Sequence, residues 1–221
     1  MVTTLGTRTD VGRSVRRAPV VAVVRTPSPE EALRQARAFA AGGAELVEIT
    51  FTVPGAPRLI RELIAARGGD GPPWYGAGTV TTAARAREAV AAGAEFLVTP
   101  NVSREVAEEA RRADLFLVLG ALTPSEIVAA HELGADLVKV YPLPPVGGAA
   151  YLATVRQPLG DLPLLAAGGF GVEEIPAYRE AGAVAFGIGA PLLGDGADET
   201  RRRVARAIEL ARAGAPAAEA G

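Results

Sequence analysis

The chain has no cysteine and one histidine among its 221 residues. The lack of cysteine excludes disulfide bonds, thiolate metal centres and thiol catalysis. A single histidine excludes a metal site built from several imidazole ligands. The 23 basic residues are balanced by 25 acidic ones and form no basic stripe, so we expect no nucleic-acid partner.

Long hydrophobic runs are also missing. The longest, such as residues 115–119, are far too short to cross a bilayer, so we expect no membrane association. Residues 1–17 contain threonine and arginine but no apolar core, which is not typical of a secretory signal. A composition of 49% hydrophobic and 22% charged residues is that of a globular protein with a large core. We therefore expect a cytoplasmic enzyme.

Lysine is almost absent, because Lys139 is the only one and every other basic residue is arginine. Lys139 lies in the apolar run 137–141, which predicts a buried strand. Arginine keeps its proton in proteins, whereas a desolvated lysine can become a neutral amine, the nucleophile of Schiff-base chemistry on carbonyl substrates. The alternatives are a lysine whose amine reaches solvent and one paired with a buried carboxylate.

A short phrase, Gly-Ala-x-apolar-apolar, recurs along the chain. It occurs at residues 43–47, 93–97 and 134–138, with a weaker copy at 182–186. Each copy follows an Ala/Glu/Arg-rich segment of helical periodicity, and glycine is favoured directly after a helix. The phrase therefore predicts a repeated unit of helix, glycine stop and strand.

The repeat leads to eight predicted strands separated by helices. The strands are expected at 20–25, 46–52, 74–80, 96–99, 115–119, 137–141, 164–167 and 185–189. The helices are expected at about 30–41, 57–67, 83–92, 104–112, 124–133, 149–157, 173–181 and 199–213. Strict βα alternation over eight units predicts a parallel sheet that closes as a (β/α)8 TIM barrel.

The competing fold is a doubly wound open sheet, but no glycine-rich dinucleotide fingerprint follows the first strand. We assign one domain, the barrel, to residues 19–212. The N-terminal segment 1–18 is expected to add a short helix that caps the bottom of the barrel. The Ala/Gly/Pro-rich tail 213–221 is expected to be disordered.

Glu48 is a second charged residue in an apolar strand. Glu48 and Lys139 each stand five residues after the glycine of the repeated phrase. We therefore expect both at the same depth on strands two and six, pointing inward and converging near the carboxyl ends, where barrel active sites lie. A structural ion pair is the alternative, although a buried pair gives little net stability.

Glycines and small polar residues follow several other strands. Glycines at 76 and 78 in strand three indicate close approach by a ligand or backbone, and Thr79 adds a hydroxyl. Paired glycines after strands seven and eight fit the phosphate-binding place of many barrels, or else form only tight loops.

These segments resemble the class I, Schiff-base family of 2-keto-3-deoxy-6-phosphogluconate (KDPG) and 4-hydroxy-2-oxoglutarate (KHG) aldolases. The resemblance covers roughly residues 19–194, and its motifs stand in family order. The matching motifs are Leu46-Val47-Glu48-Ile49-Thr50, Gly76-Ala77-Gly78-Thr79-Val80, Thr99-Pro100-Asn101, Val138-Lys139-Val140-Tyr141-Pro142 and Gly168-Gly169. The resemblance implies Lys139 as the Schiff-base lysine, Glu48 as the general acid and base, no metal or other cofactor, and a homotrimer.

The resemblance also implies roles around the substrate. Thr79 and Pro100 hold the pyruvyl group, Tyr141 lies beside the imine, and Arg25 binds an anionic end. Together with the strand-end pattern it gives the expected substrate-binding set: Arg25, Thr52, Gly78, Thr79, Pro100, Tyr141, Gly168, Gly169, Gly189 and Ala190.

The sequence departs from the family pattern at three positions. Thr52 stands where some members have an arginine for the substrate carboxylate. Ala167 and Ala190 stand where hydroxyl residues are often found, and Pro191 has no N–H to donate. Two hydroxyl donors are therefore missing from the distal pocket, which predicts a weaker dependence on a substrate phosphate.

The activity implied is cleavage of a 2-keto-3-deoxy-(6-phospho)aldonate, a small 2-keto acid, to pyruvate and an aldehyde. The alternatives within the same chemistry are 4-hydroxy-2-oxoglutarate and 2-keto-3-deoxy-6-phosphogalactonate as substrates. An alternative of another class is a non-catalytic barrel used as an oligomeric scaffold, against which the presence of both Lys139 and Glu48 argues.

Overall fold

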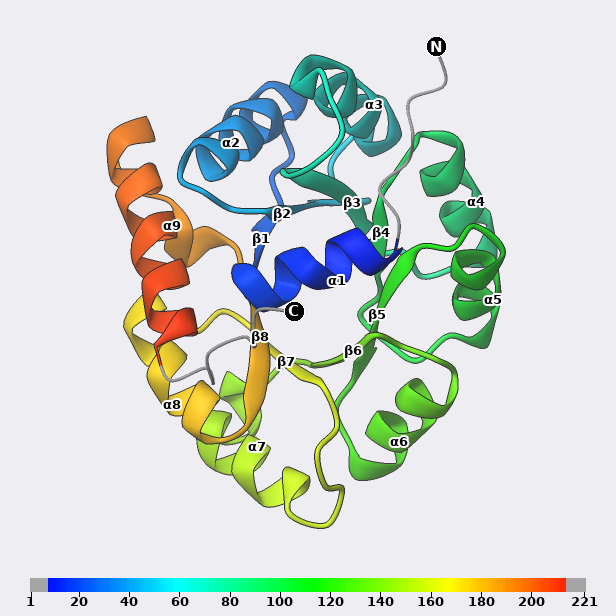
Figure 1. Ribbon diagram of the computed structural model, residues 1–221, viewed down its shortest axis with the longest axis vertical. Helices are drawn as coiled ribbons and strands as arrows, with labels where there is room; N and C mark the ends of the chain where they lie inside the picture. Colours follow the sequence, from blue (N-terminus) through cyan, green and yellow to red (C-terminus); the bar gives the residue numbers. More distant parts are fainter. Residues whose placement is uncertain (1–7, 214–221) are drawn as a thin grey trace.

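Eight parallel strands close into a barrel in the order of the sequence, with β8 paired to β1 (Figure 1). The computed structural model describes residues 8–213. The closed ring confirms the (β/α)8 prediction and excludes the open sheet. The strands are β1 Val20–Val24, β2 Leu46–Thr50, β3 Trp74–Gly78, β4 Phe96–Val98, β5 Phe116–Ala121, β6 Leu137–Val140, β7 Leu164–Ala167 and β8 Ala183–Ile188.

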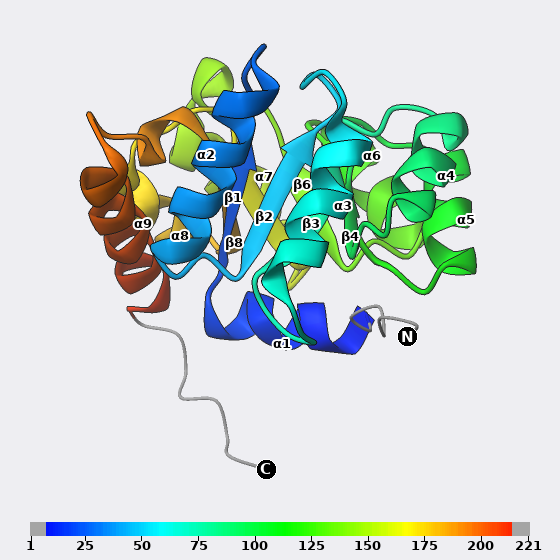
Figure 2. The ribbon, with the colours of Figure 1, turned by 90° about the horizontal axis from the view of Figure 1, so that it is seen from above.

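Helices surround the barrel, and one further helix crosses its amino-terminal end (Figures 1 and 2). The α-helices are α1 Arg8–Arg17, α2 Pro29–Ala41, α3 Ala56–Arg67, α4 Ala83–Ala91, α5 Arg104–Arg112, α6 Pro124–Glu132, α7 Gly148–Arg156, α8 Ile175–Glu180 and α9 Ala197–Arg212. Three short 3-10 helices are η1 Pro144–Val146, η2 Val172–Glu174 and η3 Ala190–Leu192.

The glycines of the repeated phrase end helices, as predicted. Their φ angles are 93° at Gly43, 85° at Gly93, 87° at Gly134 and 98° at Gly182, all in the left-handed region where a side chain is disfavoured. The chain therefore turns from each helix into the following strand at a fixed point, which sets equal depths for equivalent strand residues.

Some element boundaries differ from the prediction. The expected strand 115–119 is β5 at 116–121, and the expected 185–189 is β8 at 183–188. The expected helix 173–181 is divided into η2 and α8. Pro176 explains the division, because proline lacks an N–H and is tolerated only in the first turn of an α-helix.

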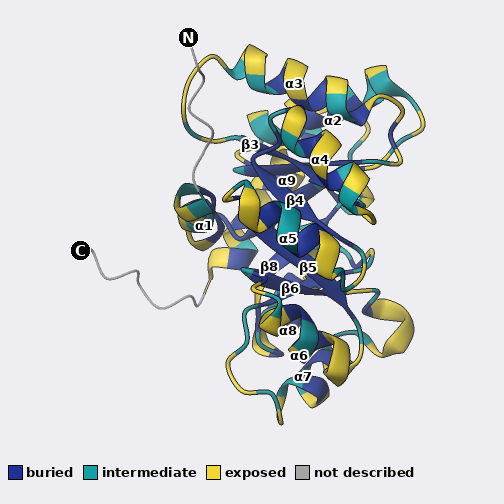
Figure 3. Ribbon diagram, turned by 90° about the vertical axis from the view of Figure 1, so that its right-hand side faces the viewer, coloured by how far each residue is buried: buried dark blue, intermediate teal, exposed yellow. Residues whose placement is uncertain are grey.

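The core has two layers, which alternate along each strand. Inward side chains fill the lower lumen and include Leu46, Phe96 and Leu137. Outward side chains such as Val47 and Val138 pack against the helices. In Figure 3 the strands are mostly buried, with Val184 of β8 an exposed exception, while the helices expose their outer faces.

Helix α1 covers the bottom of the lumen. Val11 and Val15 join the lumen cluster, and Ser14 Oγ accepts a 2.8 Å hydrogen bond from Trp74 Nε1. Arg17, at the end of the helix, pairs with Glu45. The predicted disorder of the tail 213–221 concerns residues that, apart from residue 213, lie outside the described range.

Candidate active site

Lys139 points into the lumen from β6, because its strand neighbours Val138 and Val140 belong to the outer layer. It is 8% exposed, and its Nζ lies 5.3 Å from the centre of the Tyr141 ring. A primary amine therefore stands above the apolar side chains of the lumen, at the carboxyl end of the strand.

Glu48 points into the lumen from β2, on the opposite side of the ring from β6. It is 1% exposed, and its Oε1 is buried without a hydrogen-bond partner among the described residues. An unsatisfied buried carboxylate oxygen costs free energy unless another group uses it. This acceptor is consistent with a group that takes up and returns protons.

Glycine at position 78 makes room for that carboxylate. Gly78 faces the lumen beside β2, and a Cβ atom there would overlap the carboxylate of Glu48. Gly76 makes room for the Phe96 ring in the same way. Both glycines of β3 therefore leave space for parts of the protein itself, and contact of Gly78 with the substrate stays a prediction.

Pro100 packs against a third inward-facing glycine, Gly120, which lies beside Lys139 in the sheet. Gly120 on β5 is aligned with Lys139 on β6, and a Cβ atom at Gly120 would overlap the backbone carbonyl of Pro100. Thr99 Oγ1 also accepts a 3.0 Å hydrogen bond from the Gly120 N–H. The turn after β4 is thereby held against the strand next to β6.

A pocket of about 290 Å³ opens at the carboxyl ends of β6, β7, β8 and β1. Seven of the predicted site residues line it: Arg25, Lys139, Tyr141, Gly168, Gly169, Gly189 and Ala190. Five of the predicted residues, Glu48, Thr52, Gly78, Thr79 and Pro100, are not part of this lining. They lie on the β2–β4 side of the barrel mouth.

Arg25 connects the two sides of the mouth. It lines the pocket, and its Nη2 donates a 3.3 Å hydrogen bond to Thr79 Oγ1. Thr79 has φ +58°, an unusual conformation for a β-branched residue and one found at functional sites. Arg85 Nη1 donates to the Thr79 carbonyl at 3.3 Å, and this contact helps to fix the strained residue.

Thr52 is tied to the end of β2. The hydroxyls of Thr50 and Thr52 lie 2.8 Å apart, and Thr50 Oγ1 donates to the Val24 carbonyl at 2.9 Å. Thr52 is exposed at the barrel mouth. A threonine with an anchored hydroxyl offers one uncharged hydrogen-bonding group where an arginine would offer a charged fork.

Sequence reasoning missed several lining residues, of which Gln35 is the most informative. It comes from α2, and its buried face companions are Ala32, Ala36 and Phe39. A glutamine on an otherwise apolar helix face was the available signal. The other missed lining residues are Val23, Gly187 and Leu193, and Ala167 and Pro191, which the sequence analysis placed in the distal pocket, also line it.

A larger and shallower hollow lies outside the barrel mouth, between the segment 171–174 and α9. Two of its arginines are paired, Arg206 with Glu173 at 3.1 Å and Arg203 with Glu199, whereas Arg202 makes no ion pair with the described residues. The lining of this hollow contains arginines and glutamates but no amine comparable to Lys139.

Within residues 8–213 no helix is long and apolar enough to span a membrane. The same residues contain no group of three or more His, Cys, Asp or Glu side chains placed to hold a metal ion.

The fold is a (β/α)8 barrel, and its pocket opens at the carboxyl ends of the strands, where the active sites of barrel enzymes lie. The family model for KDPG and KHG aldolase matches residues 11–206. The chain therefore belongs to the KDPG and KHG aldolase family and is an aldolase, a carbon–carbon lyase.

Individual relatives agree with this family. The chain is 31% identical over 166 residues to the 2-dehydro-3-deoxy-phosphogluconate aldolase of Treponema pallidum, covering 75% of this chain and 77% of the relative. It is 28% identical over 197 residues to the 2-dehydro-3-deoxy-6-phosphogalactonate aldolase of Escherichia coli, covering 88% and 95%.

Among solved structures, the chain is similar to the KDPG aldolase of Legionella pneumophila with pyruvate captured as a covalent carbinolamine. The TM-score is 0.69 at 26% identity, covering 91% of this chain and 96% of the other.

Proposed function

We propose that this aldolase cleaves a 2-keto-3-deoxy-(6-phospho)aldonate to pyruvate and an aldehyde through a Schiff base on Lys139. The observation that carries the proposal is the position of the sole lysine: it is buried, points inward and lines the pocket at the carboxyl ends of the strands. Structural lysines are rare in such positions, whereas amine nucleophiles require them.

The reaction begins with attack of the neutral Lys139 Nζ on the C2 ketone, which gives a carbinolamine. Loss of water from the carbinolamine gives the iminium ion. Glu48 supplies the proton that lets hydroxide leave as water, a role that suits a buried carboxyl with an unused oxygen.

Cleavage follows from the iminium ion. Glu48 takes the proton of the C4 hydroxyl, the C3–C4 bond breaks, and its electron pair moves to the iminium as an enamine. The aldehyde leaves. Protonation of the enamine at C3 and hydrolysis of the resulting iminium then release pyruvate and regenerate Lys139.

The remaining residues bind the substrate. Thr79 and Pro100 are proposed to hold the pyruvyl group, with Tyr141 beside the imine. Arg25 is proposed to bind an anionic end, and its hydrogen bond to Thr79 couples the two groups. Gly168, Gly169, Gly189 and Ala190 line the pocket, and their backbone N–H groups are proposed to contact the aldehyde half of the substrate.

The comparison with Legionella pneumophila supports the covalent route, because that related aldolase holds pyruvate as a carbinolamine. Gly78 supports the role of Glu48, because it leaves the space that this carboxylate occupies.

Borohydride reduction in the presence of pyruvate tests the proposal. Reduction of the imine is expected to add one covalent pyruvate-derived group to Lys139, located by peptide mass spectrometry. Lys139→Arg keeps the charge but cannot form the imine, so it is expected to lose both the label and the activity. Equal labelling of Lys139→Arg, or an unmodified Lys139 in the wild type, would refute the assignment.

We further propose that the enzyme is a homotrimer, as its family resemblance implies. Light scattering on the full chain is expected to give three times the mass of one chain. A monomeric mass at micromolar protein with full activity would contradict this proposal without affecting the catalytic one.

A further inference from the structure

Gln35 is a polar lining residue of the pocket that comes from α2, whereas Lys139 comes from β6. The lining runs around the barrel mouth from β6 through β7 and β8 to β1, and α2 packs against β1. Lys139 lies at one end of this arc and Gln35 at the other. Arg25 is the one charged side chain between them in this order, and the rest of the lining is mainly glycine, alanine and other apolar residues.

The Gln35 amide has a fixed orientation. Its Nε2 donates a 3.0 Å hydrogen bond to Glu31 Oε1, one turn earlier on α2. This hydrogen bond, followed by the contact with Arg34, lowers the pKa of Glu31, so the carboxylate is ionised and can only accept. The amide must therefore present its nitrogen to Glu31 and direct its carbonyl oxygen elsewhere.

That carbonyl oxygen is available to a ligand. Gln35 is 8% exposed and lines the pocket, and its Oε1 accepts no hydrogen bond from residues 8–213. A carbonyl oxygen pairs with a hydroxyl donor, whereas an ionised phosphate has only acceptor oxygens to offer it. Ala190 and Pro191 present no side-chain donor to an anion, and Arg25, the one cation in the lining besides Lys139, donates to Thr79 Oγ1 on the pyruvyl side of the proposed site.

We propose that Gln35 is a specificity-determining residue whose amide oxygen accepts a hydrogen bond from a terminal hydroxyl of the aldehyde half, so that this enzyme favours hydroxyl-terminated over phosphorylated 2-keto-3-deoxy acids. This inference rests on the proposed function, because it places the 2-keto end of the substrate at Lys139.

The test compares kcat/KM for three matched substrates: 2-keto-3-deoxygluconate, its 6-phosphate and its 6-deoxy analogue. Wild type is expected to favour the hydroxylated substrate over the 6-deoxy analogue by about tenfold, the equivalent of one hydrogen bond lost from a buried partner. Gln35→Leu is expected to lose that tenfold on the hydroxylated substrate alone. Gln157→Leu, at an exposed position after α7, is the matched control and is expected to retain the wild-type pattern.

The inference is overturned if Gln35→Leu reduces kcat/KM equally for the hydroxylated and 6-deoxy substrates, or if wild type strongly prefers the 6-phosphate. If Gln35→Leu does not fold, as judged by thermal unfolding, Gln35→Asn replaces it. Asparagine is one methylene shorter, so its amide oxygen no longer reaches the ligand, and the same loss is expected. Borohydride trapping of pyruvate uses no distal group and is expected to be unchanged in these variants. Failure of trapping in wild type would instead refute the proposed function.

Discussion

At the scale of single residues, a substitution at the buried Glu48 can test the proposed proton transfer without disturbing the fold. Glu48→Gln preserves the shape and burial of the side chain but cannot carry a proton. We expect the variant to fold and its kcat to fall by about 10²–10⁴, the usual contribution of positioned proton transfer. Steady-state kinetics measure the fall, and slower borohydride trapping is expected to accompany it.

An almost unchanged kcat in Glu48→Gln would mean that this residue serves only the structure. Thermal unfolding of the same preparation distinguishes that outcome from a misfolded protein.

Gly78 gives a second residue-scale prediction. A Cβ atom at this position would overlap the Glu48 carboxylate, so Gly78→Ala is expected to displace the carboxylate and lower kcat by at least about tenfold. Gly69→Ala is the control, because a Cβ atom there has no described neighbour within 4 Å and the backbone is not left-handed. Equal activity of the two variants would show that the Glu48 position tolerates movement.

Much of the site could be predicted from the sequence, and Glu48 and Lys139 explain why. Their equal spacing from helix-ending glycines gives their depth and direction on the strands. Gln35 carries a weaker signal, a glutamine on an otherwise apolar helix face, and packing is needed to show that this face borders the pocket. The role of Gly78 depends on a contact between neighbouring strands, which local patterns do not contain.

At the scale of elements, the amino-terminal ends of β3 and β4 are anchored to α3 by a buried ion pair. The side chains of Arg67 and Glu95 are 6% and 1% exposed and lie 2.9 Å apart. Burial raises the pKa of Glu95, while the Tyr75 N–H and Arg67 favour its charged form. Arg67 also donates to the Pro73 carbonyl, so the pair holds both the helix and the loop before β3.

Removing one partner of this pair leaves a buried charge. Arg67→Met is therefore expected to lower the free energy of unfolding by about 3–5 kcal/mol. Arg112→Met, which removes exposed contacts on α5, is the control and is expected to leave the denaturation midpoint unchanged. Urea denaturation measures both, and equal effects would contradict the role assigned to Arg67.

Element boundaries were predictable where local chemistry decides them. Ser28, Ser103 and Thr123 act as N-caps, each accepting a hydrogen bond from the backbone N–H three residues later. The extra residues of β5 and β8 were not predictable, because their extent depends on pairing with neighbours distant in sequence. Closure of the ring is likewise a property of all eight strands together.

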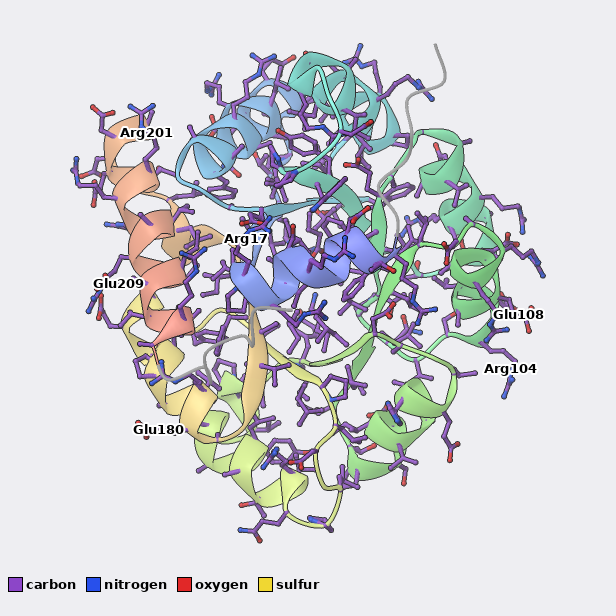
Figure 4. The ribbon with its side chains drawn as sticks, in the orientation of Figure 1. Arg17, Arg104, Glu108, Glu180, Arg201 and Glu209 are labelled. Atoms are coloured by element: carbon purple, nitrogen blue, oxygen red, sulfur yellow. The ribbon has the colours of Figure 1, made fainter. Side chains whose placement is uncertain are left out.

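At the scale of the whole molecule, ion pairs and hydrogen bonds to carboxylates decide the response to acid. Figure 4 shows charged side chains such as Arg104 and Glu108 directed away from the barrel. Hydrogen bonds from backbone N–H groups or from arginine and amide side chains lower the pKa of six carboxylates. These are Glu30, Glu31, Glu109, Glu126, Glu173 and Glu199.

A lowered pKa in the folded state means that the stabilisation is complete above the unfolded value of 4.5 and is lost as the pH falls below it. Glu95 has a raised pKa and acts in the opposite sense. Because the lowered groups are more numerous, we expect the free energy of unfolding to decrease from pH 5 to pH 3. Urea titrations at fixed pH measure this, and a protein that becomes more stable on acidification would show that Glu95 dominates.

Helix α1 leaves the barrel open at one end only, because Val11 and Val15 fill the end opposite the pocket. In the proposed reaction pyruvate is bonded to the deep lysine, so the aldehyde occupies the space between it and the mouth. Binding and release are then ordered: the aldehyde dissociates before pyruvate in cleavage and binds after pyruvate in synthesis. An aldehyde that binds before pyruvate blocks access to Lys139. Excess aldehyde is therefore expected to inhibit synthesis competitively with respect to pyruvate, which initial-rate kinetics measure.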